Sequence, residues 1–199
     1  MPGPDVRELH AEAVRASADL VSHVTTEDLP RPTPCADWNL SELLAHMTVQ
    51  HYGFAAAARG HGADPVVWQP PAPGEDPVAA YAEAVSVVLA AFAGDGVLER
   101  AFALPEISTE TTFPGRQAIA FHLVDYVVHS WDVARSLGLA VSLSPALLGY
   151  ALRVAKAVPA GENRLVPGAA FGPAIEPPAG ADPLDEILAL LGRSPSWPD

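Results

Sequence analysis

The residues best suited to chemistry lie in one stretch, FHLVDYVVHSWD, at positions 121–132. Its surroundings are so apolar that a helix formed by this stretch must be largely buried. At 100° per residue, His122, Asp125 and His129 lie within about 60° of one another on such a helix. An ionised Asp in this setting without a partner would cost several kcal/mol, so the pattern predicts a cation opposite Asp125.

Metal ligation is the chemistry that this polar stripe favours. Asp125 and His129 are four residues apart, so both side chains can reach one ion at about 2 Å. A third ligand must come from another segment, and His46 is chosen because it interrupts an otherwise continuous apolar helix face. Two His and one carboxylate leave positions open for water or substrate, as in catalytic zinc sites and some iron sites. The sequence therefore predicts a divalent metal centre formed by His46, Asp125 and His129.

Three more residues are expected around this centre: His122, Asp132 and Gln50. His122 is either a pocket wall or a substitute ligand or proton shuttle. Asp132 either orients a metal-bound histidine or pairs with Arg135, and the pairing with Arg135 is favoured.

The remaining histidines and the single cysteine are given no role in this centre. Cys35 precedes the second predicted helix and lies roughly 10 Å along the helix axis from His46, so it is not expected as a ligand. The other four histidines are expected at the surface: His10, His23, His51 and His61.

Composition limits the class of protein. The 199 residues, 49% of them hydrophobic, suffice for one domain with a substantial core. No apolar stretch approaches the roughly 18 residues that cross a bilayer, and no secretory signal is visible, so a cytoplasmic protein is expected. A net charge of −13 repels nucleic acid and anionic membranes. One cysteine excludes a disulfide framework and a cysteine-rich zinc site. The partners expected are a small-molecule substrate or a thiol, with a homodimer left open.

Periodicity and capping residues predict helices over residues 5–24, 39–59, 76–93, 114–137, 144–158 and 182–192. Residues 97–112 alternate poorly and contain Pro105, which predicts a short extended piece or a hairpin. The fold class is therefore all-α, a four-helix bundle with additional C-terminal helices. Residues 1–158 are predicted to form the metal-binding bundle. Residues 159–199 are predicted to form a Pro/Gly-rich C-terminal extension with a short helix packed on the bundle.

Four motifs carry a family resemblance. They are TPCADWNL at 33–40, LLAH at 43–46, the HxxDxxxHxWDxA pattern at 122–134, and FGP at 171–173 with LLGR at 190–193. Together they resemble the actinobacterial metal-binding branch of the DinB-like superfamily, which is similar to the N-terminal domain of mycothiol-dependent maleylpyruvate isomerase. The resemblance covers nearly the whole chain. It implies a DinB-like four-helix bundle with a metal site at His46, Asp125 and His129.

The sequence departs from this family at two places. The isomerase has Glu where this chain has Asp125, and other DinB-like proteins have His there. The shorter Asp reaches less far, which leaves the ion open between zinc, nickel and other divalent metals. The isomerase also has a distinct C-terminal domain that does not match this chain's tail, so maleylpyruvate isomerisation is not transferred to this chain.

Two functions follow from the motif and the resemblance. A metal with an open position can bind a small thiol as a thiolate at neutral pH. The first function is a metal-dependent thiol (mycothiol-like) transferase or isomerase that acts on a small electrophilic molecule. The alternative is a non-catalytic metal-binding or small-ligand-sensing bundle with a structural ion. The sequence identifies no catalytic residue.

Overall fold

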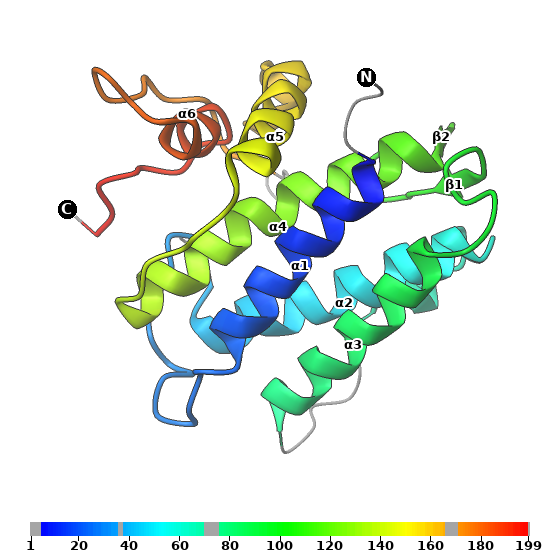
Figure 1. The fold of residues 1–199 in the computed structure, drawn as a ribbon, viewed down its shortest axis with the longest axis horizontal. Helices are drawn as coiled ribbons and strands as arrows, with labels where there is room; N and C mark the ends of the chain where they lie inside the picture. The colour runs from blue at the N-terminus through cyan, green and yellow to red at the C-terminus, as the bar shows by residue number, and fades with distance from the viewer. Residues whose placement is uncertain (1–4, 36–37, 70–75, 166–170, 199) are drawn as a thin grey trace.

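Four long helices enclose the core of this protein. The computed structural model describes residues 5–35, 38–69, 76–165 and 171–198. The helices are α1 (Val6–Val21), α2 (Leu40–Ala58), α3 (Pro77–Phe92) and α4 (Gly115–Leu137). Helix α1 packs on α4, α2 packs on α3, and α1–α3 and α2–α4 contacts close the bundle (Figure 1). The predicted all-α four-helix bundle is confirmed.

Side-chain caps set the beginnings of most of the helices, as the sequence predicts, whereas α4 begins after Pro114 without one. The Asn39 side chain accepts a hydrogen bond from the Glu42 backbone N–H, and the Glu42 carboxylate accepts one from Asn39. This reciprocal pair is a capping box. Asp76, Ser144 and Asp182 each accept from a backbone N–H of the first turn, while the following proline occupies the first helical position.

A short hairpin joins α3 to α4. Strands β1 (Ala101–Ala103) and β2 (Thr112–Pro114) pair in antiparallel register, and β2 leads directly into α4. The hairpin alternative predicted for residues 97–112 is therefore the one that forms. Before α3, the short 3₁₀ helix η1 (Pro65–Trp68) packs on α2.

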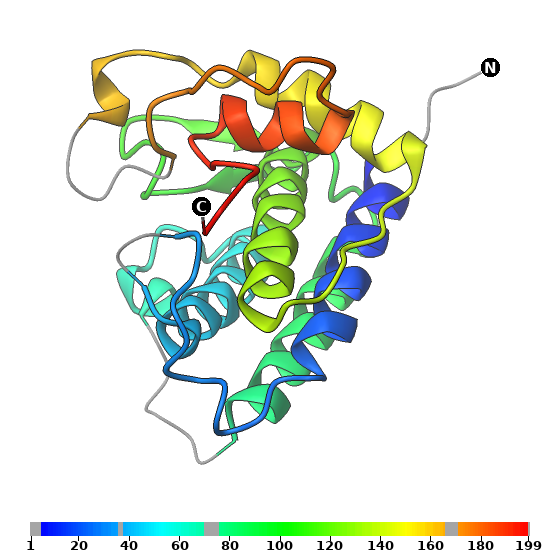
Figure 2. The same ribbon diagram turned by 90° about the vertical axis from the view of Figure 1, so that its left-hand side faces the viewer.

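The C-terminal part of the chain lies along the bundle. Helix α5 (Pro145–Ala157) packs on α4, and after the 3₁₀ turn η2 (Glu162–Arg164), α6 (Pro183–Leu190) packs on α5 (Figure 2). The buried Arg164 side chain donates to the backbone carbonyls of Val158, Pro159 and Leu190, at the ends of α5 and α6. A short packed helix is thus present where one was predicted. The division at residue 158 into two units stays a prediction.

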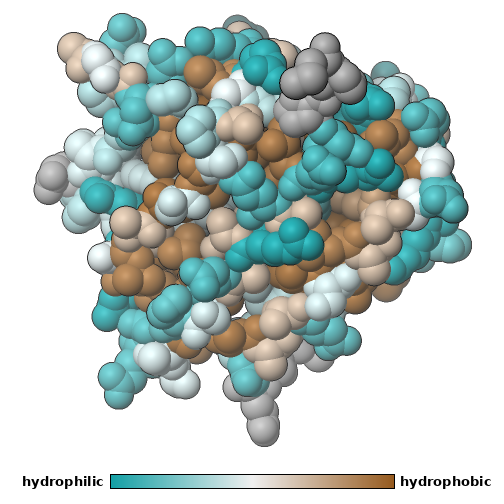
Figure 3. All heavy atoms as spheres, in the orientation of Figure 1, coloured by the Kyte–Doolittle hydropathy of each residue, from teal (hydrophilic) through white to brown (hydrophobic). Residues whose placement is uncertain are grey.

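Helix α4 is the most deeply buried element, and 17 of its 23 residues are buried. The view in Figure 3 shows apolar areas separated by hydrophilic side chains. Within the described ranges, no helix has both the length and the apolar character that crossing a membrane requires. The burial of α4 means that its polar side chains must find partners inside the protein.

Candidate metal centre

The structure brings His46, Asp125 and His129 together. His46 comes from α2 and the other two from α4, and one potential ligand atom of each lies within 4.8 Å of the others. His129 Nε2 is 3.4 Å from Asp125 Oδ1. Two ligands at about 2.1 Å from a tetrahedral ion are about 3.4 Å apart, so this pair already has a suitable spacing. The three residues fit a divalent ion by type and by distance.

The centre is buried on one side and accessible on the other. His129 is only 4% exposed, whereas the Asp125 side chain is 24% exposed and His46 is half-buried. The Trp38 ring lies against the His46 ring, with centroids 4.5 Å apart. His46 and Asp125 therefore form the side of the centre that is in contact with solvent.

Asp132 orients His129 from inside the bundle. The His129 Nδ1–H donates to Asp132 Oδ2 at 2.9 Å, which directs Nε2 toward Asp125. Such a carboxylate fixes the tautomer of a ligating histidine. The favoured pairing of Asp132 with Arg135 is wrong. Arg135 lies at the surface, where it donates to the Trp197 carbonyl, so it is directed away from the fully buried Asp132.

The charges of the three residues balance one another without an ion. Burial opposes a charge on His129, but the flanking carboxylates of Asp125 and Asp132 raise its pKa to about 9. Burial also opposes a charge on Asp125, yet the facing His129 holds the pKa of Asp125 below its usual value. Burial lowers the pKa of His46 to about 4. At neutral pH the centre therefore holds a proton on His129, which supplies one positive charge opposite Asp125.

Two residues near the centre were missed by the sequence analysis. Arg193, which follows α6, forms an ion pair with Asp132 at 3.1 Å. Glu106, from the loop between β1 and β2, accepts a hydrogen bond from the buried Gln50 at 2.7 Å. Gln50 lies one helical turn after His46, on the same side of α2. Its hydrogen bond therefore places the Glu106 carboxylate on the side of α2 that carries His46. Arg193 belongs to the quoted LLGR motif, whereas nothing in the sequence around Glu106 marks it.

His122 lies in a second cluster, away from the three ligands. His122 Nδ1 is 2.8 Å from His10 Nε2, and His122 Nε2 is 3.3 Å from His51 Nδ1. We call His10, His122 and His51 the inner histidine chain. Both ring nitrogens of His122 are engaged, and among the described residues His122 does not belong to the group that could hold an ion. A role of His122 in the pocket stays a prediction.

The expected surface positions of His10 and His51 are wrong. Both are 1% exposed or less, although His23 and His61 are exposed as expected. On α1, His10 shares a buried face with Val14, Ser17 and Val21, at helical spacing. This buried face lies beside the apolar stripe through Val6, Leu9, Ala13 and Leu20.

The remaining site prediction concerns Cys35. Its Sγ accepts a hydrogen bond from Arg193 Nη2 at 3.2 Å. Among the described residues it does not belong to the group that could hold an ion. That Cys35 is not a ligand stays a prediction.

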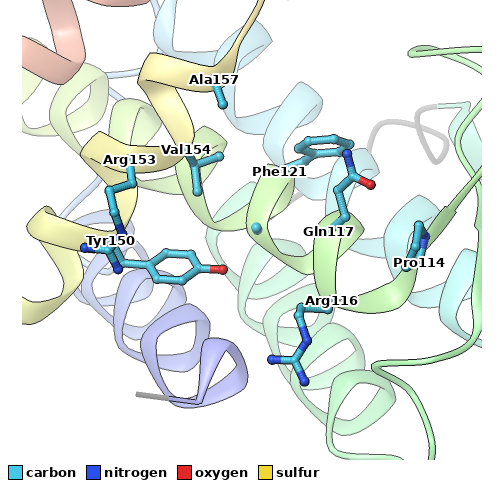
Figure 4. A pocket seen from close by; sticks show the side chains of 9 residues that line it. Pro114, Arg116, Gln117, Phe121, Tyr150, Arg153, Val154 and Ala157 are labelled. Carbon is cyan, nitrogen blue, oxygen red and sulfur yellow. The ribbon is translucent and has the colours of Figure 1, made fainter. Parts of the chain in front are cut away.

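A surface groove of about 500 Å³ lies elsewhere, between α4 and α5. Figure 4 shows Gln117 and Phe121 of α4 on one side of it and Tyr150 and Arg153 of α5 on the other. None of its lining residues belongs to the metal centre.

Comparison with known proteins agrees with the motifs. Residues 10–134 match the family model described as mycothiol maleylpyruvate isomerase N-terminal domain. Two uncharacterized proteins of Mycobacterium tuberculosis, from strains CDC 1551 / Oshkosh and ATCC 25618 / H37Rv, are each 31% identical over 185 residues. These alignments cover 93% of this chain and 96% of each relative. No solved structure matches the chain significantly. The family match spans all three residues of the centre, and the chain belongs to the mycothiol maleylpyruvate isomerase N-terminal domain family.

Proposed function

We propose that this protein binds one divalent ion, zinc or nickel, through His46, Asp125 and His129 and uses it in a thiol-dependent transfer or isomerisation. The thiol would be a low-molecular-weight one such as mycothiol, and the substrate a small electrophilic molecule. The observation that carries the proposal is the convergence of the three ligand atoms within 4.8 Å, with His129 held by Asp132. The family supports the link to mycothiol. The proposal places the protein in the cytoplasm, where thiols are kept reduced.

Charge around the centre favours an anionic further ligand. Asp125 contributes one negative charge, and the charge of Asp132 is offset by its ion pair with Arg193. A divalent ion would therefore leave one positive charge in excess. No fourth His, Cys, Asp or Glu of the described ranges joins the three. When bound, the ion would lower the pKa of a thiol and stabilise the thiolate.

The protein's own residues divide the remaining tasks. Asp132 keeps Nδ1 of His129 protonated, so that Nε2 is the nitrogen directed at the site. Trp38 covers one side of His46 and limits the access of water there. Gln50 holds the Glu106 carboxylate one turn along α2, where burial raises the pKa of Glu106.

The proposal is tested by metal analysis and thiol titration of the full chain purified without a histidine tag. We expect about one divalent ion per chain. In cobalt-substituted protein, millimolar thiol should produce sulfur-to-metal charge-transfer bands, which should be absent from the metal-free protein. A spectrum that stays unchanged with several thiols, mycothiol included, would favour the non-catalytic structural ion. Protein that takes up no divalent ion would refute the site itself.

Binding of the ion should release about one proton per chain at pH 7.5. His129, with a pKa of about 9, is protonated at this pH and must lose that proton to ligate, whereas His46, with a pKa of about 4, is already neutral. Calorimetric titration with zinc in buffers of different ionisation enthalpy measures the number released. Release of no proton would show that His129 is not a ligand.

A further inference from the structure

We propose that Arg193, in the C-terminal extension, is a positioning residue of the metal centre. It would fix the carboxylate of Asp132, which in turn fixes the His129 ring. This inference rests on the proposed function, because it assigns the ligand role to His129. It makes the extension a part of the site instead of an appendage to the bundle.

The contacts form one continuous path from the tail to the ligand. Arg193 Nε is 3.1 Å from Asp132 Oδ1, and Nη2 is 3.3 Å from Oδ2. Asp132 Oδ2 also accepts the Nδ1–H of His129 at 2.9 Å. Two nitrogens of the guanidinium therefore meet both oxygens of the carboxylate. This two-point contact fixes the direction of the carboxylate as well as its charge.

Burial makes Asp132 dependent on this arginine. Asp132 is 0% exposed and Arg193 only 8% exposed. In the described part of the chain, Arg193 and His129 are the side chains that hydrogen-bond the Asp132 carboxylate. Without Arg193, the carboxylate would be a buried charge held on one side alone, and it could rotate away from His129.

The backbone around Arg193 is itself fixed. Gly192 ends the last helix with φ 80°, a conformation that favours glycine, and it lies against Gly172, whose backbone would be 2.8 Å from an added Cβ. The Arg193 N–H donates to the Leu188 carbonyl at 2.8 Å. On the far side, Nη2 reaches Cys35 Sγ. The guanidinium is thus held between the tail, α4 and the loop before α2.

The first test measures zinc affinity by competition with a chelator, on full-length protein. Arg193→Gln should weaken binding about 10- to 100-fold, the range found for residues that support metal ligands. Arg193→Lys keeps the charge but loses the two-point contact, so it should restore binding in part. Arg135→Gln is the matched control, because Arg135 also joins α4 to the tail but does not touch Asp132. It should leave the affinity unchanged.

A double-mutant cycle separates positioning from simple attachment of the tail. If Arg193 acts through Asp132, Arg193→Gln should have little further effect in an Asp132→Asn background. If the effects of the two substitutions on affinity are additive, or if Arg135→Gln weakens binding equally, the positioning role is refuted.

A measurement without metal separates a failure of this inference from a failure of the proposed function. In metal-free protein, the His129 ring nitrogens report its Nδ1–H···Asp132 hydrogen bond by ¹⁵N NMR. Arg193→Gln should shift the Nδ1 resonance and speed exchange of its proton, and Arg193→Lys should do so less. Wild-type protein that binds no zinc would refute the proposed function alone. Unchanged His129 resonances in Arg193→Gln would refute the positioning role.

Discussion

Asp125→Ala and His129→Ala are each expected to abolish stoichiometric metal binding, lowering the affinity at least about 100-fold. Loss of a residue that only supports a ligand costs about 10- to 100-fold, and loss of a ligand itself should cost more. His46→Ala should act in the same direction, because His46 supplies the third ligand atom from the other helix. Elemental analysis after dialysis, with chelator competition for the affinity, measures the effect.

Controls for this prediction are available in the chain. His23→Ala and His61→Ala remove exposed histidines and should leave one ion bound. Asp125→Glu keeps the carboxylate with one more methylene and should retain binding, since the isomerase domain that this chain resembles has Glu at this position. Thermal unfolding of the metal-free variants checks that the fold survives. Full occupancy in Asp125→Ala or His129→Ala would refute the site assignment.

Acid is expected to destabilise this protein steeply below pH 6.5. Burial lowers the pKa of His10 to about 3 and holds the pKa of His51 and His122 well below the usual value. The unfolded chain, with ordinary histidines, binds protons that the folded chain excludes, so stability falls as the pH falls through 6.5. Burial also lowers the pKa of His46 to about 4, so four such residues can remove up to about 5 kcal/mol per pH unit. This loss is large against a total stability of about 5–15 kcal/mol.

Urea unfolding of metal-free protein at several values between pH 6.5 and 5 measures this loss. The pKa values of Asp5, Asp28 and Asp125 are lowered in the folded state and lie below this pH window. These carboxyl groups therefore stay ionised during the measurement and do not add to the loss of stability. His10→Leu should reduce the slope of stability against pH, whereas His23→Leu, at an exposed residue in the turn after the same helix, should not. An unaltered slope in His10→Leu would show that the buried histidines do not control acid stability.

The titration of His129 changes the stability in the opposite direction to that of the buried histidines, so the two effects must be separated. The pKa of His129 in the metal-free fold is about 9, above its unfolded value. Its contribution is therefore complete below pH 6.5 and is lost as the pH rises through 9. Acid measurements below pH 6.5 are free of it.

Local signals in the sequence predicted most of the fold. The starts of α2, α3, α5 and α6 coincide with capping residues whose chemistry acts within a few residues of the chain. The convergence of His46, Asp125 and His129 could be predicted because a charged Asp125 inside an apolar helix requires a partner. This requirement follows from burial alone and needs no tertiary coordinates.

What the sequence did not predict depends on packing between distant segments. Arg193 reaches Asp132 only because α6 packs on α5 and turns at Gly192, and no periodic pattern records that docking. Glu106 lies in a loop without regular structure, so its contact with Gln50 had no signal. The burial of His10 and His51 does have a signal in the sequence. Each residue lies on a second buried face of its helix, beside the main apolar stripe.

The hydrogen bonds of the inner histidine chain all run in one direction, from donor to acceptor. Each neutral imidazole carries one proton on its two nitrogens. His122 contacts His10 through Nδ1 and His51 through Nε2, so the nitrogen that carries its proton decides which neighbour receives a hydrogen bond and which donates one. The three tautomers are therefore coupled, and only two arrangements satisfy both contacts.

These two arrangements differ in where the chain ends with a donor. In one, an N–H is left at His51 Nε2. In the other, it is left at His10 Nδ1. Neither of these buried nitrogens has a hydrogen-bond partner among the described residues. Reversing the direction requires all three protons to move together, so the core of this bundle holds its protons in one of two concerted patterns.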